Sequence, residues 1–306
     1  MAWTVLLCLV FLVAAAVVSW NILAPRLSLR HDRTAPRNAG TGILKGAEPL
    51  RLGPDDAPNA VLFVHGFSGT PNNFKDLPML AAQAGWHARA MLLPGHGTSP
   101  LDFDQTSPDE LEAAVDREVK DLLGGHRRVV LVGHSMGGAL AALCAAKNPD
   151  VAGLVLAAPY FGITRRWWLG LTPETWINSL GRLVVWVYSP PGHQPVRRPG
   201  VSRLILSYPW ITTRSGRNAM EVARRAGSTG VVGKITQPVL LIHSKLDGIT
   251  SPEMARAVLD RFPSQQKHHV ELTDSDHMIF WDNEEEVVNR EVLDFLKTIE
   301  KAPLNH

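Results

Sequence analysis

The chain has 306 residues, of which 45% are apolar and 20% are charged, and its formal net charge is +2. These values are typical of a globular protein and exclude a disordered chain, a collagen-like chain and a multi-span membrane protein. With only two cysteines, Cys8 and Cys144, a disulfide framework and a cysteine-based zinc site are also excluded. This length can bury one large domain, or one domain that carries an insertion.

Residues 1–25 contain no charged side chain and form an apolar run long enough to cross a bilayer, which needs about 20 residues. Trp3 and Trp20 lie near its two ends, where indole rings favour the headgroup region. A cleavable signal peptide would begin with basic residues and end at a small-residue cleavage site. Here no Lys or Arg precedes the run, and the alanines at 14–16 lie inside it. We therefore predict an uncleaved transmembrane anchor, with secretion or a periplasmic location after cleavage as the alternative.

Residues 26–42 are predicted to be a linker, because they contain basic residues, proline and glycine without periodicity. Arginines follow the anchor at positions 26, 30, 33 and 37, whereas only the amino terminus precedes it. The positive-inside rule therefore favours a single-pass membrane protein with its globular domain on the cytoplasmic side.

Residues 43–159 and 238–306 are predicted to form an α/β core, in which short apolar runs alternate with helical patterns. The apolar runs predict buried strands at residues 60–64, 88–93, 128–132, 151–157, 238–242 and 268–272. The other patterns predict helices at residues 74–85, 106–122, 138–147 and 284–301. Because no tight hairpin interrupts the alternation, we expect a mostly parallel sheet with helices on both faces.

Residues 160–237 interrupt this alternation. They contain eleven basic residues and two acidic ones, for a net charge of +9, which leaves −7 for the rest of the chain. Five of the nine tryptophans also lie here: Trp167, Trp168, Trp176, Trp186 and Trp210. We predict a basic, tryptophan-rich helical cap, inserted over the sheet edge where ligands bind. For most of these side chains the plainer interpretation is a solvated arginine surface around the cap's own small core.

The sequence Gly133-His134-Ser135-Met136-Gly137 lies between a predicted buried strand and a predicted helix of small residues. Strand, sharp turn and helix are the context of a nucleophile elbow, in which Ser135 presents its hydroxyl above the sheet. Gly133 and Gly137 fit this turn because a Cβ there would collide as strand and helix close on each other. The helix start would also direct backbone N–H groups toward the serine. A chance glycine-rich turn is the alternative.

With this elbow, the chain resembles the α/β-hydrolase superfamily, and within it the carboxylesterase and monoacylglycerol-lipase-like serine hydrolases. Two further motifs carry the resemblance, each after a predicted strand: His65-Gly66-Phe67 and Leu93-Pro94-Gly95-His96-Gly97. The resemblance covers about residues 43–301. It implies the α/β-hydrolase fold and a Ser–acid–His triad in that chain order, with the acid after a late strand and the histidine in a loop near the end.

A serine needs a general base to attack an ester at neutral pH. His277 lies between the last predicted strand and the closing helix, where the resemblance implies the base. Asp247 follows the predicted strand at 238–242, where the resemblance implies the acid that orients and charge-stabilises this base. Asp274 and Asp276 are closer in sequence, but a residue one or three positions away rarely reaches the correct ring nitrogen. We therefore favour Asp247.

The other histidines near these motifs are interpreted as structural. His65 and His96 lie in glycine-adjacent turns and are expected to hold loops by hydrogen bonds. His134 adjoins the nucleophile and is expected to point away from the reacting face. His268 and His269 are neighbours in a predicted strand and face opposite sides, so they make a poor metal pair.

The oxyanion formed on attack needs two preorganised donors. One is expected to be the backbone N–H of Met136, the residue after the nucleophile, and the other that of Phe67 in the loop after the first buried strand. No glycine-rich phosphate loop and no metal-ligand spacing is visible in the sequence, so we expect no cofactor, no metal and no nucleic-acid partner.

The leading hypothesis is a membrane-anchored serine hydrolase that cleaves carboxylic esters through an acyl-enzyme on Ser135. The anchor and the basic aromatic cap suggest a lipid-derived substrate, such as a monoacylglycerol, drawn from an anionic surface. An acyltransferase or thioesterase with the same triad is the first alternative, and a catalytically silent membrane scaffold is the second. The sequence assigns no oligomeric state.

Overall fold

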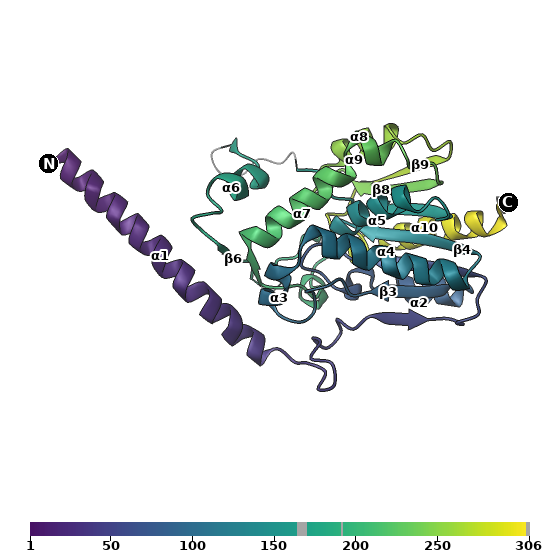
Figure 1. Ribbon diagram of the computed structural model, residues 1–306, viewed down its shortest axis with the longest axis horizontal. Helices are drawn as coiled ribbons and strands as arrows, with labels where there is room; N and C mark the ends of the chain where they lie inside the picture. Colours follow the sequence, from purple (N-terminus) through teal and green to yellow (C-terminus); the bar gives the residue numbers. More distant parts are fainter. Residues whose placement is uncertain (164–169, 191, 304–306) are drawn as a thin grey trace.

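The computed structural model describes residues 1–163, 170–190 and 192–303, and consists of an α/β domain with one long helix extending from it (Figure 1). A seven-stranded sheet lies at the centre of the domain, in the order β1-β3-β2-β4-β5-β8-β9. Neighbouring strands are parallel except β1, which pairs antiparallel with β3. The bounds are β1 Leu50–Leu52, β2 Asn59–Val64, β3 His87–Met91, β4 Arg128–His134, β5 Gly153–Ala157, β8 Val239–Ser244 and β9 Lys267–Leu272. The predicted α/β fold with a mostly parallel sheet is confirmed.

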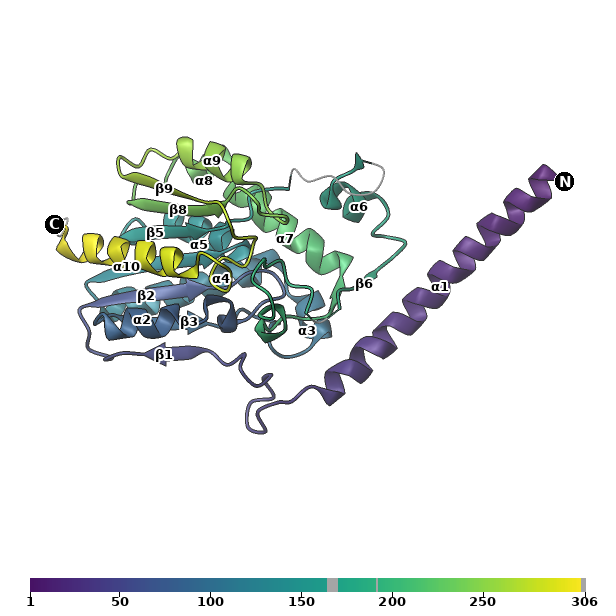
Figure 2. The same cartoon turned by 180° about the vertical axis from the view of Figure 1, so that it is seen from behind.

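Helices cover both faces of the sheet, as predicted. Their bounds in the core are α2 Leu77–Gln83, α3 Pro100–Gln105, α4 Pro108–Gly125, α5 Met136–Lys147, α9 Pro252–Asp260 and α10 Glu285–Lys301. Strand β2 is buried throughout because its side chains alternate between two apolar layers. Leu62 and Val64 pack in the layer of α4, α5 and α9, whereas Val61 and Phe63 face α2 and α10. Figure 1 shows α4 and α5 in front of the sheet, and Figure 2 shows α2 and α10 on the opposite face.

The helix predicted at residues 74–85 is shorter in the structure. A 3₁₀ turn, η1 (Pro71–Phe74), comes first, and Lys75 then adopts a left-handed φ of 48° that separates it from α2. Pro78 lies in the first turn of α2, where the missing N–H of a proline has no helical partner to lose. The turn chemistry therefore outweighs the apolar periodicity here.

Helix α1 runs from Ala2 to Thr34, so residues 26–34 are helical and the predicted linker begins only after them. His31 and Arg33 lie in the last turn, where positive charge interacts favourably with the helix dipole. An 18-residue window of α1 has a mean hydropathy of 2.6 and is not buried against the rest of the described chain. By length and composition it could cross a membrane or act as a signal sequence.

The predicted cap region contains both helices and strands. Its elements are α6 Pro173–Ser179, β6 Trp186–Tyr188, η3 Ser202–Leu204, β7 Trp210–Thr212, α7 Thr213–Ala226 and α8 Thr229–Val232. Strands β6 and β7 pair as an antiparallel two-stranded ribbon, which the prediction of a helical cap missed. Trp186 and Trp210 are buried in a cluster with Ala24 and Trp20 of α1 rather than in a core of the cap alone, while Trp167 and Trp168 lie outside the described residues. Helices α7 and α8 share their apolar cluster with α5 of the core.

Candidate active site

Ser135 forms a one-residue turn between β4 and α5, with φ 54° and ψ −120°. A non-glycine residue in this conformation is strained, and such strain is held in place by the surrounding structure. The flanking glycines permit it. A Cβ on Gly133 would lie 2.3 Å from the carbonyl oxygen of Gly137, and a Cβ on Gly137 would lie 1.9 Å from that of Val64. Strand and helix thus cross at a distance that only glycine allows.

Three loops at the carboxyl end of the sheet bring Ser135, His277 and Asp247 together. The Ser135 hydroxyl oxygen lies 3.0 Å from Nε2 of His277, and Nδ1 of His277 lies 2.8 Å from Oδ2 of Asp247. His277 donates from Nδ1 to the carboxylate, which leaves Nε2 free to accept the serine proton. Asp276 instead accepts from the backbone N–H groups of His277 and Gly248.

The Asp247 carboxylate is fully buried and accepts five hydrogen bonds. Oδ1 accepts from the backbone N–H groups of Ile249 and Thr250, both at 2.8 Å. Oδ2 accepts from the Thr250 hydroxyl at 2.9 Å and from Nε2 of His243 at 3.1 Å, in addition to His277. Burial alone would raise the pKa of Asp247, but the charge of His277 and the hydrogen bonds from both histidines hold that pKa well below its usual range. The carboxylate is therefore ionised at neutral pH.

His134 does not point away from the site, contrary to the prediction. Its Nε2 lies 3.1 Å from the carbonyl oxygen of His277, and the two rings are 5.0 Å apart. At the end of β4 its ring lies on the sheet face that carries Phe74 and Phe280, where the loop of His277 closes. Burial, followed by the nearby charge of His277, lowers the pKa of His134 to about 3. The neutral ring therefore donates from Nε2 to the carbonyl of His277 and holds this loop in place.

Four further histidines, His65, His96, His268 and His269, make contacts that agree with their structural interpretation. His65 accepts at Nε2 from the Leu93 backbone N–H at 3.0 Å, and Nδ1 of His96 lies 2.9 Å from the Pro94 carbonyl, so both hold loops. His268 and His269 point to opposite sides of β9, toward Glu291 on α10 and Arg256 on α9 respectively: His268 lies 3.7 Å from Glu291, and His269 2.6 Å from Arg256.

Among the buried polar residues near the site that the sequence did not predict, two hold the candidate acid and the loop of His277. One is His243, which donates a hydrogen bond to Asp247. The available sequence signal for it was a histidine four residues before the predicted acid. The other is Asp282, whose side chain is fully buried. Its carboxylate accepts the backbone N–H groups of Arg197, Arg198, Asp276 and Asn283 at 2.7 to 3.0 Å. It therefore connects the segment that follows β6 in the cap to the loop that carries His277, a contact for which the sequence holds no local signal.

The predicted oxyanion donors, Phe67 and Met136, lie in the segments that flank Ser135. Met136 is the first residue of α5, so its N–H has no carbonyl partner within the helix. The loop of Phe67 passes close to Ser135, because a Cβ on Gly66 would lie 3.0 Å from the Cβ of that residue. Ser68 follows with a φ of 54°, which turns the chain sharply beside the site.

Two cavities meet at Ser135, Phe67 and Ile249. The first, about 210 Å³, has a mixed lining in which apolar side chains such as Ile211 and Met278 lie beside polar ones such as Ser189 and Gln194; it is the more polar of the two and is called the polar cavity. The apolar cavity, about 130 Å³, is lined largely by side chains of the cap region such as Tyr160, Ile177 and Met220. Ser135 therefore lies at the junction of a cavity with a mixed lining and one with an almost wholly apolar lining.

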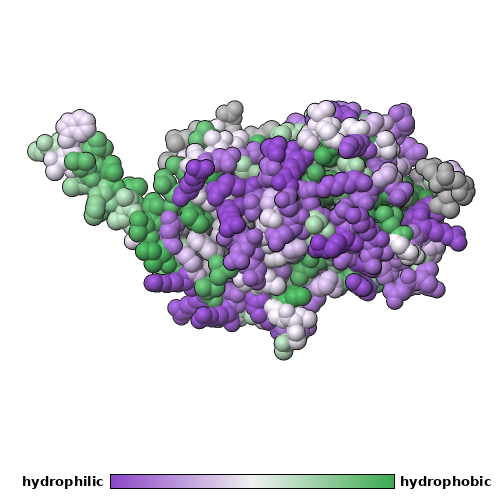
Figure 3. Space-filling model, viewed as in Figure 1, coloured by the Kyte–Doolittle hydropathy of each residue, from purple (hydrophilic) through white to green (hydrophobic). Residues whose placement is uncertain are grey.

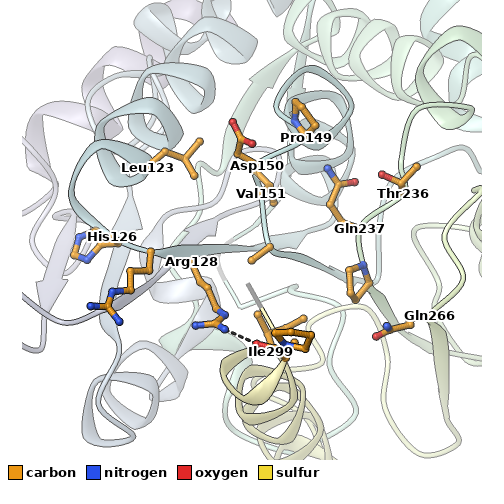
Figure 4. Close-up of a pocket in the computed structure, with 15 residues that line it drawn as sticks. Leu123, His126, Arg128, Pro149, Asp150, Val151, Thr236, Gln237, Gln266 and Ile299 are labelled. Carbon is orange, nitrogen blue, oxygen red and sulfur yellow. Dashed lines mark hydrogen bonds between the residues drawn. The ribbon is translucent and has the colours of Figure 1, made fainter. Parts of the chain in front are cut away.

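A larger hollow of about 580 Å³ lies at the opposite end of the sheet (Figure 4). Arg128 at the start of β4 lines it and donates to the carbonyl of Ala302, and Asp150 and Gln237 lie across from it. No serine or cysteine is present among the lining residues that the structure describes. Ligands of parallel sheets bind at the carboxyl ends of the strands, so we assign the site to the cavities at Ser135.

Comparison with known proteins agrees with this geometry. Residues 55–286 match the family described as serine aminopeptidase, S33. A thermostable monoacylglycerol lipase from Bacillus sp. (strain H-257) is 28% identical over 261 residues, covering 83% of this chain and 95% of that protein. A pimeloyl-[acyl-carrier protein] methyl ester esterase from Neisseria meningitidis is 29% identical over 215 residues, covering 65% of this chain and 79% of its own length.

Solved structures show the same fold. A monoacylglycerol lipase from Paleococcus ferrophilus superimposes with a TM-score of 0.69 at 25% identity, over 82% of this chain and 98% of that one. A structure reported for the metagenome-derived lipolytic enzymes LipS and LipT gives a TM-score of 0.75 at 23% identity, over 84% of this chain and 99% of that one. The chain therefore belongs to the serine aminopeptidase S33 family of α/β-hydrolases, and its relatives include esterases and lipases.

Proposed function

We propose that the protein is a membrane-anchored serine hydrolase that cleaves carboxylic esters of lipid origin, with Ser135 as nucleophile, His277 as general base and Asp247 as the acid that orients it. The observation that carries the proposal is the hydrogen-bonded chain from Ser135 through His277 to Asp247, which ends at the junction of the polar and the apolar cavity. An ester with an apolar acyl chain and a polar alcohol fits that division.

The reaction would proceed in two halves. Ser135 attacks the ester carbonyl while His277 takes its proton, and the ionised Asp247 stabilises the resulting imidazolium. The backbone N–H groups of Phe67 and Met136 would bind the oxyanion. His277 then protonates the departing alcohol and an acyl-enzyme remains on Ser135. In the second half His277 activates a water molecule, which releases the carboxylic acid and frees the serine.

The substrate class follows from the surroundings of the site. A monoacylglycerol carries a long acyl chain on a small polar alcohol, and we assign the chain to the apolar cavity and the glycerol to the polar one. The apolar window of α1 would hold the enzyme at a bilayer, where such lipids reside. The net charge of +9 over residues 160–237 favours an anionic surface.

A fluorophosphonate probe and two substrates test the proposal. The wild-type full chain in phospholipid vesicles is expected to be labelled, and the Ser135→Ala variant is not. Monooleoylglycerol in the same vesicles should be turned over faster than short soluble esters. If the folded wild-type protein is not labelled, the proposed hydrolase activity is wrong, and a catalytically silent membrane scaffold is the remaining alternative. Transfer of the acyl group to an added alcohol in preference to water, or faster cleavage of thioesters, would favour the alternatives that use the same triad.

A further inference from the structure

One face of helix α1, at residues 20–28, contacts the cap at β6 and the core at α3. Trp20, Asn21, Ala24 and Ser28 lie on this face at helical spacing, and Ala24 and Ser28 are almost completely buried. In contrast, the described side chains of residues 2–16 are all exposed. Figure 3 shows this free part of the helix as a largely hydrophobic rod that leaves the domain. One helix therefore has a lipid-like surface at its start and a protein contact at its end.

Asn21 forms a two-point contact with the chain that leads into β6. Its amide donates to the carbonyl of Leu183 at 2.6 Å, and its side-chain oxygen accepts the backbone N–H of Val185 at 3.0 Å. Beside it, Nε1 of Trp20 donates to the carbonyl of Trp186 at 2.8 Å. Three hydrogen bonds from two adjacent residues to three fixed backbone positions set the register between α1 and the start of β6.

The β6–β7 ribbon separates α1 from the nucleophile. On one face, Trp210 lies 5.9 Å from Trp20 and 4.7 Å from its cross-strand partner Tyr188, measured between ring centroids. Successive side chains of a strand alternate between faces. Ile211, the next residue, accordingly lines the polar cavity together with Ser135. The wall of that cavity is therefore supported from outside by α1.

The length of α1 sets the depth at which its contact with β6 would lie relative to a bilayer. Residues 2–19 would span about 27 Å at 1.5 Å per residue, close to the thickness of about 30 Å of a bilayer's hydrocarbon core. Trp20 and Asn21 would then lie at the edge of that core, the level that tryptophan favours. Three large apolar side chains beside the contact are exposed: Leu180, Leu183 and Tyr188. Arg182 among them is also exposed and suits anionic headgroups.

We propose that α1 holds the β6–β7 ribbon at the bilayer surface, where the exposed side chains of Leu180, Leu183 and Tyr188 contact lipid and the polar cavity takes its substrate from the membrane. The partner is the lipid bilayer itself, because the apolar surface of α1 continues into these exposed side chains. The proposal rests on the proposed membrane anchor and ester hydrolysis. It adds a residue outside the family match, Asn21, as a positioning residue for the cavity wall.

Spin labelling of the full chain tests the depth. With Cys8→Ala as background, nitroxides are placed by Leu183→Cys beside the contact and by Asp150→Cys at the far end of the sheet, both exposed positions. The vesicles contain phosphatidylcholine and phosphatidylglycerol. The label at 183 should collide more often with oxygen, which concentrates in the bilayer, than with a water-soluble nickel complex. The label at 150 should collide more often with the nickel complex. If the label at 183 is as accessible to nickel as the label at 150, the proposal is wrong.

Activity tests the role of Asn21. Asn21→Ala removes two hydrogen bonds, and we expect hydrolysis of vesicle-borne monooleoylglycerol to fall about tenfold or more. Soluble p-nitrophenyl acetate should be cleaved within threefold of the wild-type rate. The control Ile22→Ala changes the exposed neighbouring residue and should alter neither rate. Equal loss on both substrates, or none on either, would overturn the role of Asn21. If the wild type cleaves neither ester, the proposed function fails, whereas the label at 183 still reports the ribbon's depth.

Discussion

Replacing His134 with phenylalanine is expected to make the protein less stable at neutral pH and more stable in mild acid. The His134 ring is buried and packs edge-on against Phe74 and Phe280, so a phenyl ring fits the same space. The variant loses the hydrogen bond from Nε2 to the carbonyl of His277, which contributes about 1 kcal/mol. It also loses a titrating group whose pKa is about 3 in the folded protein.

Proton uptake gives the sign of the effect. An unfolded histidine has a pKa of about 6.5, so below that pH the unfolded chain binds a proton at His134 that the folded chain does not. The wild type therefore loses about 1.4 kcal/mol of unfolding free energy per pH unit from this group, until the pH approaches the folded pKa. Between pH 6.5 and 5 the loss is about 2 kcal/mol, and His134→Phe does not suffer it. The variant should be about 1 kcal/mol less stable at pH 7 and about 1 kcal/mol more stable at pH 5.

Urea unfolding of the full chain in detergent micelles at pH 7 and pH 5, followed by circular dichroism, measures this crossover. His268→Gln is the matched control for the loss of an imidazole, because that side chain is 66% exposed. The reasoning is refuted if wild type and His134→Phe lose the same unfolding free energy between the two pH values.

Three further substitutions give separate outcomes. Asp247→Asn should lower kcat for ester hydrolysis about 10⁴-fold at unchanged fold, because an amide facing Nδ1 of His277 favours the wrong tautomer; steady-state kinetics with circular dichroism checks both. Gly137→Ala should fail to fold, since its Cβ would lie 1.9 Å from a carbonyl oxygen of β2, whereas Gly124→Ala meets nothing within 4 Å and should unfold at the wild-type temperature. His243→Phe removes one hydrogen-bond donor from Asp247, so the carboxylate charge is less neutralised and stabilises a protonated His277 more strongly. The acidic pKa of the kcat/KM profile should therefore rise. A slower enzyme with an unshifted profile would indicate that His243 has a packing role only.

The fold could be predicted because its determinants are local in the sequence. Each of the buried parallel strands in the centre of the sheet is a short continuous apolar run, and the glycines around Ser135 lie within two residues of it. Strand β1 was missed because three residues of half-buried character carry no periodicity. The ribbon of β6 and β7 was missed for the same reason, since each strand again has three residues.

The surroundings of the candidate site were predicted less well, because they depend on contacts between distant parts of the chain. His134 was expected to turn away from the reacting face, since adjacent side chains of a strand alternate. In the structure the loop of His277, 143 residues later, closes over the face that His134 occupies. Asn21 lies 164 residues from Val185, and nothing in its own sequence environment distinguishes it from a polar residue at the end of an apolar run.

The segment from residue 183 to residue 198 illustrates how such contacts shape the site. Asn21 holds its beginning through the backbone of Leu183 and Val185, and Asp282 holds its end through the backbone of Arg197 and Arg198. Described residues between these two points line the polar cavity. The buried carboxylate of Asp282 also binds the loop of His277, so cavity wall and candidate base share one support. The width of the polar cavity thus depends on where α1 holds the other end, and a domain without α1 would keep only one of the two attachments. We therefore expect the preference for the alcohol group to change when α1 is removed, even where the hydrogen bonds from Ser135 to Asp247 are intact.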